Sequence, residues 1–292
     1  MTTRAVTAEF ESRRSLLFTV AYELLGSAVD AEDVVQETWL QWAKADHAEV
    51  RDPRAFLIRI VTRQAFNRMR TLARRRETYV GQWLPEPLLT TPDVAEDVEL
   101  AESVSIAMLR VLETLGPTER VVFVLREVFA VPYDEIASAL GKKPDAVRQI
   151  ARRARSHVDA RSPRVRVSHV EHTEVVGRLL AAIRTGDLDG LMDVLAPDVV
   201  AFGDGGGRAR AAPQPIHGAD RVARSLLLVG SAEGVSVHSL WVNGALAITI
   251  ELDGALHAVT SIQVDDGRVT RLYGVNNPEK LTYLGRATPL AT

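Results

Sequence analysis

Apolar residues recur at spacings of three and four through about the first 160 residues, which is the period of an amphipathic helix. Breaks at Gly26 and Gly141 separate helical stretches. Asp30 and the pair Asp52-Pro53 are expected to start helices, because a short carboxylate caps free N–H groups and proline fits the first turn. The pattern predicts helices over residues 9–25, from Asp30 through Leu40, and over 53–76, 94–115, 118–129, 133–140 and 144–160.

The pattern changes after Pro163. Amphipathic helices are predicted over residues 171–185 and 188–195. Strand-like apolar runs follow at 199–202, 235–238, 246–250 and 258–264, and the pairs Asn243-Gly244, Asp253-Gly254 and Asp266-Gly267 are typical of hairpin turns. Helices followed by a curved antiparallel sheet predict an α+β domain.

Residues 79–95 interrupt the helical pattern. Pro85, Pro87 and Pro92 exclude a regular helix, so we interpret this segment as a linker. Linkers are normally polar, yet Trp83 and Leu84 are apolar. This pair predicts that the linker docks on a surface.

Composition sets the class of protein. The 292 residues are 46% apolar and 25% charged, which is typical of about two globular domains. The absence of cysteine excludes disulfides, thiolate nucleophiles and cysteine zinc sites. No apolar run approaches ~18 residues. We therefore expect a cytoplasmic protein with no membrane partner.

Charge is strongly segregated although the net charge is only −3. Residues 51–76 carry nine arginines against one acid, and residues 142–161 carry seven bases against two acids. Residues 23–52 carry eight acids against two bases. The two basic blocks predict two separate anionic contacts, and the alternative is a pair of solvated helix faces.

Helical spacing divides the first basic block into two stripes. Leu57, Val61 and Ala65 lie on the apolar one. Arginine pairs with phosphates and base edges, so the other stripe favours nucleic-acid binding. The alternative is pairing with the acids of residues 30–37. The basic stripe consists of Arg59, Arg63, Asn67, Arg70 and Arg74.

The second basic block has the pattern of a helix-turn-helix. A short helix with Ile136, Ala137 and Leu140 on its apolar face is followed by Gly141 and a basic helix. The basic helix of this motif enters the major groove, although many helical hairpins share the pattern. The acidic helix carries Asp33, Gln36, Glu37 and Leu40 on one face, which suits a protein partner or, alternatively, solvent.

Candidate chemistry in the C-terminal part is weak. Asp204, His217, His238, Glu251 and His257 could serve an acid–base reaction, but no spacing pairs them, so we expect no enzyme and no catalytic residue. His169 and His172 flank Glu171 at a spacing that a metal could use, but a solvated helix start is the commoner explanation. We expect no metal and no cofactor.

Two segments resemble one known family. Residues 30–40 resemble region 2, and residues 133–155 resemble region 4, of bacterial extracytoplasmic-function sigma factors. Three further segments are similar to the sigma-J-like subgroup, which carries a C-terminal SnoaL-like domain: Trp83-Leu84-Pro85-Glu86-Pro87, Asp204-Gly205-Gly206-Gly207-Arg208 and Asn277-Pro278-Glu279-Lys280-Leu281. Arg208 replaces the usual lysine and Glu279 an aspartate, and both keep the charge.

The resemblance implies a sigma factor that directs promoter-specific initiation and is modulated in cis by its C-terminal domain. The alternative is a one-component helix-turn-helix regulator whose cone binds or turns over a small molecule. The implied fold is two all-α domains, the second a helix-turn-helix, followed by an α+β SnoaL-like cone. The implied domains are region 2 over 1–78, the linker over 79–103, region 4 over 104–161 and the cone over 168–285.

The resemblance also implies partners and residue roles. The partners are the β′ clamp helices of RNA polymerase core, promoter DNA, the chain's own C-terminal domain and a small-molecule ligand of unknown identity. Asn67 stands where the family often has aspartate, which leaves the −10 preference open. The residues expected to bind the −10 element are Arg59, Arg63, Asn67, Arg68, Arg70 and Arg74, and those expected to bind the −35 element are Lys143, Arg148, Gln149, Arg152 and Arg153. The residues expected to bind the polymerase are Asp33, Gln36, Glu37 and Leu40. The residues expected in the interdomain contact are Trp83 to Pro87, Asp204, Gly205, Gly206, Gly207, Arg208, Asn277, Pro278, Glu279 and Lys280.

Overall fold

The computed structural model describes residues 3–91, 104–161 and 167–284. The chain divides into two compact units. The first comprises Met1–Glu77 with Met108–Ser162, and the second comprises Thr78–Ala107 with Pro163–Thr292. The proline-containing segment after residue 77 thus groups with the C-terminal part.

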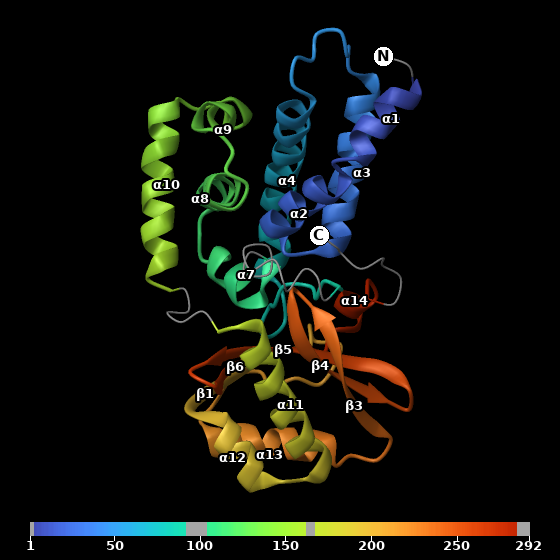
Figure 1. Cartoon of the computed structure of the whole chain (residues 1–292), viewed down its shortest axis with the longest axis vertical. Coiled ribbons are helices and arrows are strands. Elements are labelled where there is room, and N and C mark those ends of the chain that lie inside the picture. Colours follow the sequence, from blue (N-terminus) through green and yellow to red (C-terminus); the bar gives the residue numbers. More distant parts are fainter. Residues whose placement is uncertain (1–2, 92–103, 162–166, 285–292) are drawn as a thin grey trace. The chain divides into compact units, whose positions relative to one another are not determined.

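Four helices begin the first unit: α1 (Thr3–Glu11), α2 (Arg14–Leu25), α3 (Ala28–Lys44) and α4 (Pro53–Glu77) (Figure 1). The prediction of one helix over residues 9–25 is wrong, because the chain breaks between α1 and α2. The predicted cap at Asp30 is also wrong: Ser27 is the N-cap of α3, and its hydroxyl accepts the Asp30 N–H at 3.1 Å. The cap at Asp52 is confirmed, since its carboxylate accepts the Ala55 N–H at 3.1 Å.

The remaining helices of this unit are α7 (Ile106–Leu112), α8 (Pro117–Phe123), a π-helix (Val124–Val128), α9 (Tyr133–Leu140) and α10 (Pro144–Asp159). The helix predicted over 118–129 instead changes to π geometry at Val124. The start predicted near Val94 lies outside the described residues. The helix-turn-helix is confirmed: Gly141 ends α9 in the left-handed region at φ 62°, and α10 follows with proline at its start.

Arg120 joins the two halves of the first unit. It lies on α8, its side chain is buried, and its Nε and Nη2 donate to the Glu23 carbonyl at 3.0 and 2.8 Å. That carbonyl belongs to the last turn of α2, where helix carbonyls lack intrahelical donors. Arg120 Nη1 also pairs with Glu113 at 2.9 Å. A buried guanidinium thus supplies hydrogen-bond donors to a carbonyl at the C-terminal end of another helix.

The second unit is an α+β domain whose six strands have the order β2-β1-β6-β5-β4-β3. Its strands are β1 (Leu195–Asp204), β2 (Ile216–His217), β3 (Val235–Val242), β4 (Ala245–Leu252), β5 (Ala255–Asp265) and β6 (Arg268–Val275). The three predicted hairpin turns join β3 to β6 in sequence. The sheet is mixed rather than wholly antiparallel, because β1 pairs parallel with β6.

Helices α11 (His169–Thr185), α12 (Leu188–Val194) and α13 (Ala219–Gly230) pack with the sheet around one apolar core (Figure 1). Val176, Leu179, Leu191 and Val199 are fully buried in it. The sequence pattern did not predict α13 or β2. A last short helix, α14 (Pro278–Leu281), follows β6. Among helices in the described ranges, none has the length and apolarity of a membrane span.

Candidate DNA-binding surfaces and the linker site

Helix α4 presents the basic stripe that its sequence predicted. Arg59, Arg63, Asn67 and Arg70 are exposed, whereas the apolar stripe is buried. The Arg59 guanidinium lies 5.1 Å from the centre of the Phe56 ring. The side chain of Arg74 lies outside the described residues. One face of α4 therefore packs while the opposite face can meet an anionic partner.

Arg68 differs from the rest of this set. Its Nε lies 3.0 Å from an Asp30 carboxylate oxygen, and its Nη2 pairs with Asp33. The structure thus brings together a residue expected at DNA and one expected at polymerase. The alternative to nucleic-acid binding was that the basic stripe pairs with the acids of residues 30–37. Arg68 makes such pairs in this structure. Gln36, Glu37 and Leu40 lie exposed on α3 beside Asp33, and Leu40 is 56% exposed.

Helix α10 is amphipathic in the same way. Val147, Ile150, Ala151, Ala154 and Val158 are buried on one side. Arg155 is held by both oxygens of Glu127, at 2.6 and 3.1 Å. Arg148 pairs with Asp145 at 2.6 Å. The residues expected at the −35 element are all exposed: Lys143, Arg148, Gln149, Arg152 and Arg153.

Residues 79–91 run in extended form along the C-terminal domain, within the second unit. Leu84 and Leu88 are 0% and 1% exposed. Leu89 forms an isolated antiparallel bridge with Val242 of β3, so the segment adds backbone contacts at that end of the sheet. The docking surface that Trp83 and Leu84 predicted is the C-terminal domain.

Asp204, the last residue of β1, is the centre of this docking site. It is fully buried, and its carboxylate accepts three hydrogen bonds: from Tyr79 Oη at 2.6 Å, from the Leu84 N–H at 2.8 Å and from Lys280 Nζ at 2.7 Å. A buried carboxylate requires such donors, because burial without them is costly. Asp204 thereby fixes both ends of the segment from Tyr79 to Leu84.

Lys280 of α14 completes the site. It is 6% exposed, and its Nζ also donates to the Leu84 carbonyl at 2.5 Å. The ammonium lies 4.1 Å from the centre of the Trp83 ring and 4.9 Å from that of Tyr79. Aromatic faces attract cations. Leu84 therefore binds through its N–H to the carboxylate and through its carbonyl to the ammonium.

Asn277 and Gly206 bring the remaining two motifs to the same place. The N–H groups of Asn276 and Asn277 donate to the Asp204 carbonyl at 2.7 and 2.9 Å, and Asn277 Nδ2 donates to Tyr79 Oη at 2.9 Å. Gly206 has φ +58°, and a Cβ there would collide with Asn277 Nδ2 and Tyr79 Oη. Burial, and then the bond to Asp204, raise the pKa of Tyr79, which keeps its hydroxyl a donor. We call Tyr79, Leu84, Asp204, Asn277 and Lys280 the latch.

The other motif residues surround the latch. Arg208 and Glu279, the two departures from the subgroup pattern, pair with each other at 2.9 Å on the surface. Pro85 and Pro87 are buried, whereas Gly207 and Pro278 are exposed. Gly205 is buried, Glu86 is half-buried, and the Trp83 ring faces the Lys280 ammonium.

Asn243 forms a second anchor, which the sequence indicated only as a hairpin turn. It is 2% exposed, and its Oδ1 accepts the Leu88 N–H at 3.1 Å while its own N–H donates to the Leu88 carbonyl at 2.8 Å. Its Nδ2 donates to the Val104 carbonyl at 2.7 Å. Thr90 contributes further bonds to Trp241 and Gly244. The turn between β3 and β4 thus holds the linker at Leu88 and Thr90.

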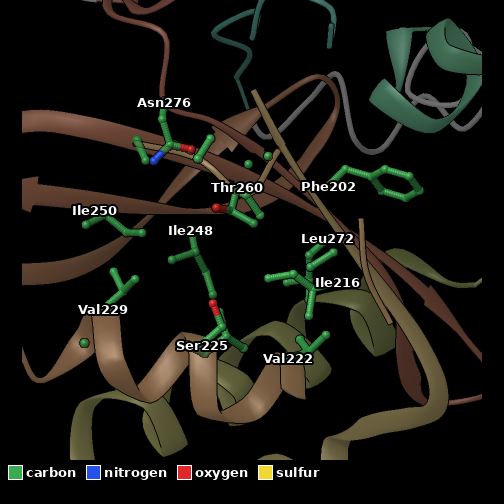
Figure 2. Close-up of a pocket in the computed structure, with 18 of the residues that line it drawn as sticks. Phe202, Ile216, Val222, Ser225, Val229, Ile248, Ile250, Thr260, Leu272 and Asn276 are labelled. Atoms are coloured by element: carbon green, nitrogen blue, oxygen red, sulfur yellow. The ribbon is translucent and has the colours of Figure 1, made fainter. Parts of the chain in front are cut away.

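The C-terminal domain also contains a cavity of about 190 Å³. Figure 2 shows Val222, Ser225 and Val229 of α13 on one side of it, and Thr260, Ile250 and Asn276 on the sheet side. The candidate acid–base residues Asp204, His217, His238, Glu251 and His257 do not line this cavity. His238 and Glu251 lie 4.0 Å apart outside it.

The histidine pair at the start of α11 is accounted for by local contacts. His169 lies against Trp241 with ring centres 4.8 Å apart, and a ring nitrogen of His172 lies 3.0 Å from the Ile262 carbonyl. Burial lowers the pKa of His172. Within the described residues, no three His, Cys, Asp or Glu side chains are grouped as metal ligands.

Comparison with known proteins agrees with this architecture. Residues 10–75 match Sigma-70 region 2, and residues 105–158 match Sigma-70 region 4. The chain is 42% identical over 290 residues to the ECF RNA polymerase sigma factor SigJ of Mycobacterium tuberculosis, covering 94% of this chain and 93% of that one. The chain belongs to the extracytoplasmic-function sigma factors. The resemblance seen in the sequence is confirmed.

A second relative and a solved structure each cover 94% of this sigma factor. The probable ECF RNA polymerase sigma factor SigI of M. tuberculosis is 31% identical over 279 residues, with 94% of each chain covered. The crystal structure of M. tuberculosis SigJ matches with a TM-score of 0.75 and 39% identity, covering 94% of this sigma factor and 98% of that chain. The helical regions followed by an α+β domain are confirmed, and the one-component regulator is not favoured.

Proposed function

We propose that this sigma factor binds RNA polymerase core in the cytoplasm and directs initiation at promoters with −10 and −35 elements, without itself catalysing a reaction. Two exposed basic helix faces support the DNA contacts, because arginine binds both phosphates and base edges. The exposed face with Gln36, Glu37 and Leu40 supports the polymerase contact, since a protein interface combines apolar and polar groups.

We further propose that the C-terminal domain restrains the sigma regions through the latch. The observation that carries this is the buried Asp204–Lys280 pair, which holds the backbone of Leu84 at both its N–H and its carbonyl. Residues 79–91 belong to the covalent connection between region 2, matched over residues 10–75, and region 4, matched over residues 105–158. When these residues are docked on the cone, less of the linker is free. The two regions then have less reach toward separate promoter elements.

Run-off transcription with core polymerase and a matched promoter tests both proposals. The proteins are the full chain, the full chain with Lys280→Met, and truncations after residue 164 and after residue 275. The second truncation keeps β6 but removes Asn277 and Lys280. Glu279→Gln is the control: it breaks the surface pair with Arg208 and none of the hydrogen bonds of the latch, so we expect it to transcribe like the wild type.

We expect promoter-specific transcript from the full chain and more transcript from Lys280→Met and from the truncation after residue 275. No transcript and no core binding by any of these proteins would refute the sigma function. Transcription from the full chain alone would show that the C-terminal domain is a required positive element, which contradicts restraint by the latch.

A further inference from the structure

The cavity of the C-terminal domain is mostly apolar, with polar groups at a few positions. Figure 2 shows Ile248, Leu272, Ile216 and Val222 around it. Ser225 from α13 and Thr260 from β5 supply hydroxyl groups. Apolar walls with a few polar groups are the usual lining of a small-molecule site. A cavity of about 150 Å³ holds benzene, so about 190 Å³ suits one substituted ring or a chain of about eight carbons.

The polar groups that could orient a ligand gather at one end of the β1–β6 pair. Gly203 is opposite Gly274 in this pair, and Asn276 follows two residues later. A Cβ built on Gly203 would lie 3.2 Å from the Ala211 Cβ, so the segment with Arg210 packs at the same end. Both Arg210 and Asn276 line the cavity.

Arg210 is the charged residue of the lining. It is exposed, and within the part of the chain that the structure describes no carboxylate pairs with it. A guanidinium in an apolar lining suits a carboxylate, because arginine binds carboxylates through two parallel N–H groups. The Asn276 amide lines the same cavity and has N–H groups to offer the same carboxylate. A neutral hydrocarbon would make no hydrogen bond with either the Arg210 guanidinium or the Asn276 amide.

We propose that this cavity binds a small hydrophobic monocarboxylic acid, with the carboxylate at Arg210 and Asn276 and the hydrocarbon between α13 and the sheet. The ligand class is an aromatic acid with one ring or a medium-chain fatty acid. This proposal deepens the latch proposal and rests on it only for its regulatory consequence.

The site and the latch share two pieces of backbone. Gly203 lines the cavity and Asp204 follows it, and Asn276 lines the cavity and Asn277 follows it. The loop from Gly205 to Ala212 starts directly after Asp204 of the latch and ends in residues that line the cavity. Because a ligand favours the state in which its site is formed, the acid strengthens the latch.

Binding is tested on the full chain with octanoate, phenylacetate and the neutral probe octan-1-ol, by calorimetric titration and by thermal unfolding. Arg210→Gln removes the charge at the proposed carboxylate site. Val229→Trp fills the cavity from a position that is already 40% exposed, which spares the core. Leu228→Trp is the matched control, since this neighbour on α13 is 75% exposed and does not line the cavity.

We expect at least one acid to bind and to raise the Tm of the C-terminal domain by about 3 °C or more at saturation. Arg210→Gln lowers the affinity for that acid about tenfold and abolishes the preference of the cavity for the acid over octan-1-ol. Val229→Trp abolishes binding and Leu228→Trp does not. Equal binding of octanol and acid overturns the ligand class. Binding unaffected by Val229→Trp, or no binding of either acid at millimolar concentration, overturns the site.

The coupling between acid binding and the latch is measured separately, by hydrogen exchange of the Leu84 amide, which donates to Asp204. The bound acid slows this exchange in the wild type and not in Lys280→Met. A bound acid that leaves the exchange of Leu84 unchanged overturns the coupling. If the acid binds as expected but Lys280→Met transcribes like the wild type, the latch proposal fails while the binding site stands.

Discussion

A buried ion pair between Asp204 and Lys280 lies at the centre of the latch, and each charge depends on the other for its stability. Lys280→Met leaves the fully buried carboxylate of Asp204 without its cation, so we expect it to lower the free energy of unfolding of the C-terminal domain by about 3–5 kcal/mol. Asp204→Asn in the same chain removes the unpaired charge and recovers part of that loss. Urea unfolding followed by ¹⁹F NMR of fluorotryptophan at Trp83 and Trp241 measures both. Equal losses in the single and double variants would contradict this coupling.

His172 gives the C-terminal domain a pH dependence on the acid side. Burial lowers its pKa in the folded state, so the unfolded state binds the proton more readily. The domain is therefore stable above the ordinary histidine pKa of about 6.5 and loses stability as the pH falls through that value toward the lower folded pKa. Tm measured between pH 7.5 and 5 falls more steeply in wild type than in His172→Gln. Parallel pH profiles would exclude His172 as the cause.

At the scale of elements, two arginines of α10 with different surroundings have different expected roles. Arg152 is exposed, whereas Arg155 is held by both oxygens of Glu127. We expect Arg152→Ala to weaken binding of −35 DNA by polymerase holoenzyme and to lower the slope of log K against log salt by about 1. Arg155→Ala is the matched control and changes the slope less. Fluorescence anisotropy at several salt concentrations measures this. Equal slopes for wild type and Arg152→Ala would exclude this arginine from phosphate contact.

Elements formed by local signals were predictable from the sequence. Helix α9 and the turn at Gly141 agree with the pattern because cap, period and glycine lie within a few residues. Helix α13 was missed although its residues are amphipathic, and the strand β6 was indicated only by the turn before it. The motifs of the latch were recognised, but the contacts between them join positions more than 70 residues apart. Asn243 was missed as an anchor because an Asn-Gly turn already explains its sequence.

At the scale of the whole molecule, the linker has two anchors on the same domain. The latch holds it at Leu84, and Asn243 holds it at Leu88. When one anchor is formed, it keeps the groups of the other anchor close together. Each anchor therefore raises the effective concentration at which the other forms. If the docked linker restrains the sigma regions as proposed, we expect the connection between them to open fully only when both anchors release.

Hydrogen exchange distinguishes stepwise from concerted release of the linker. Lys280→Met is expected to speed exchange at the Leu84 amide and leave Leu88 protected, since Leu88 donates to Asn243. Asn243→Gly is expected to speed exchange at the Leu88 amide and leave Leu84 protected. The turn itself remains, because glycine readily adopts the φ of 55° found at this position. The double variant exposes both amides, and its transcription exceeds that of either single variant. If either single change exposes Leu84 and Leu88 to the same degree, the segment releases as one unit, and restraint then depends on the weaker anchor alone.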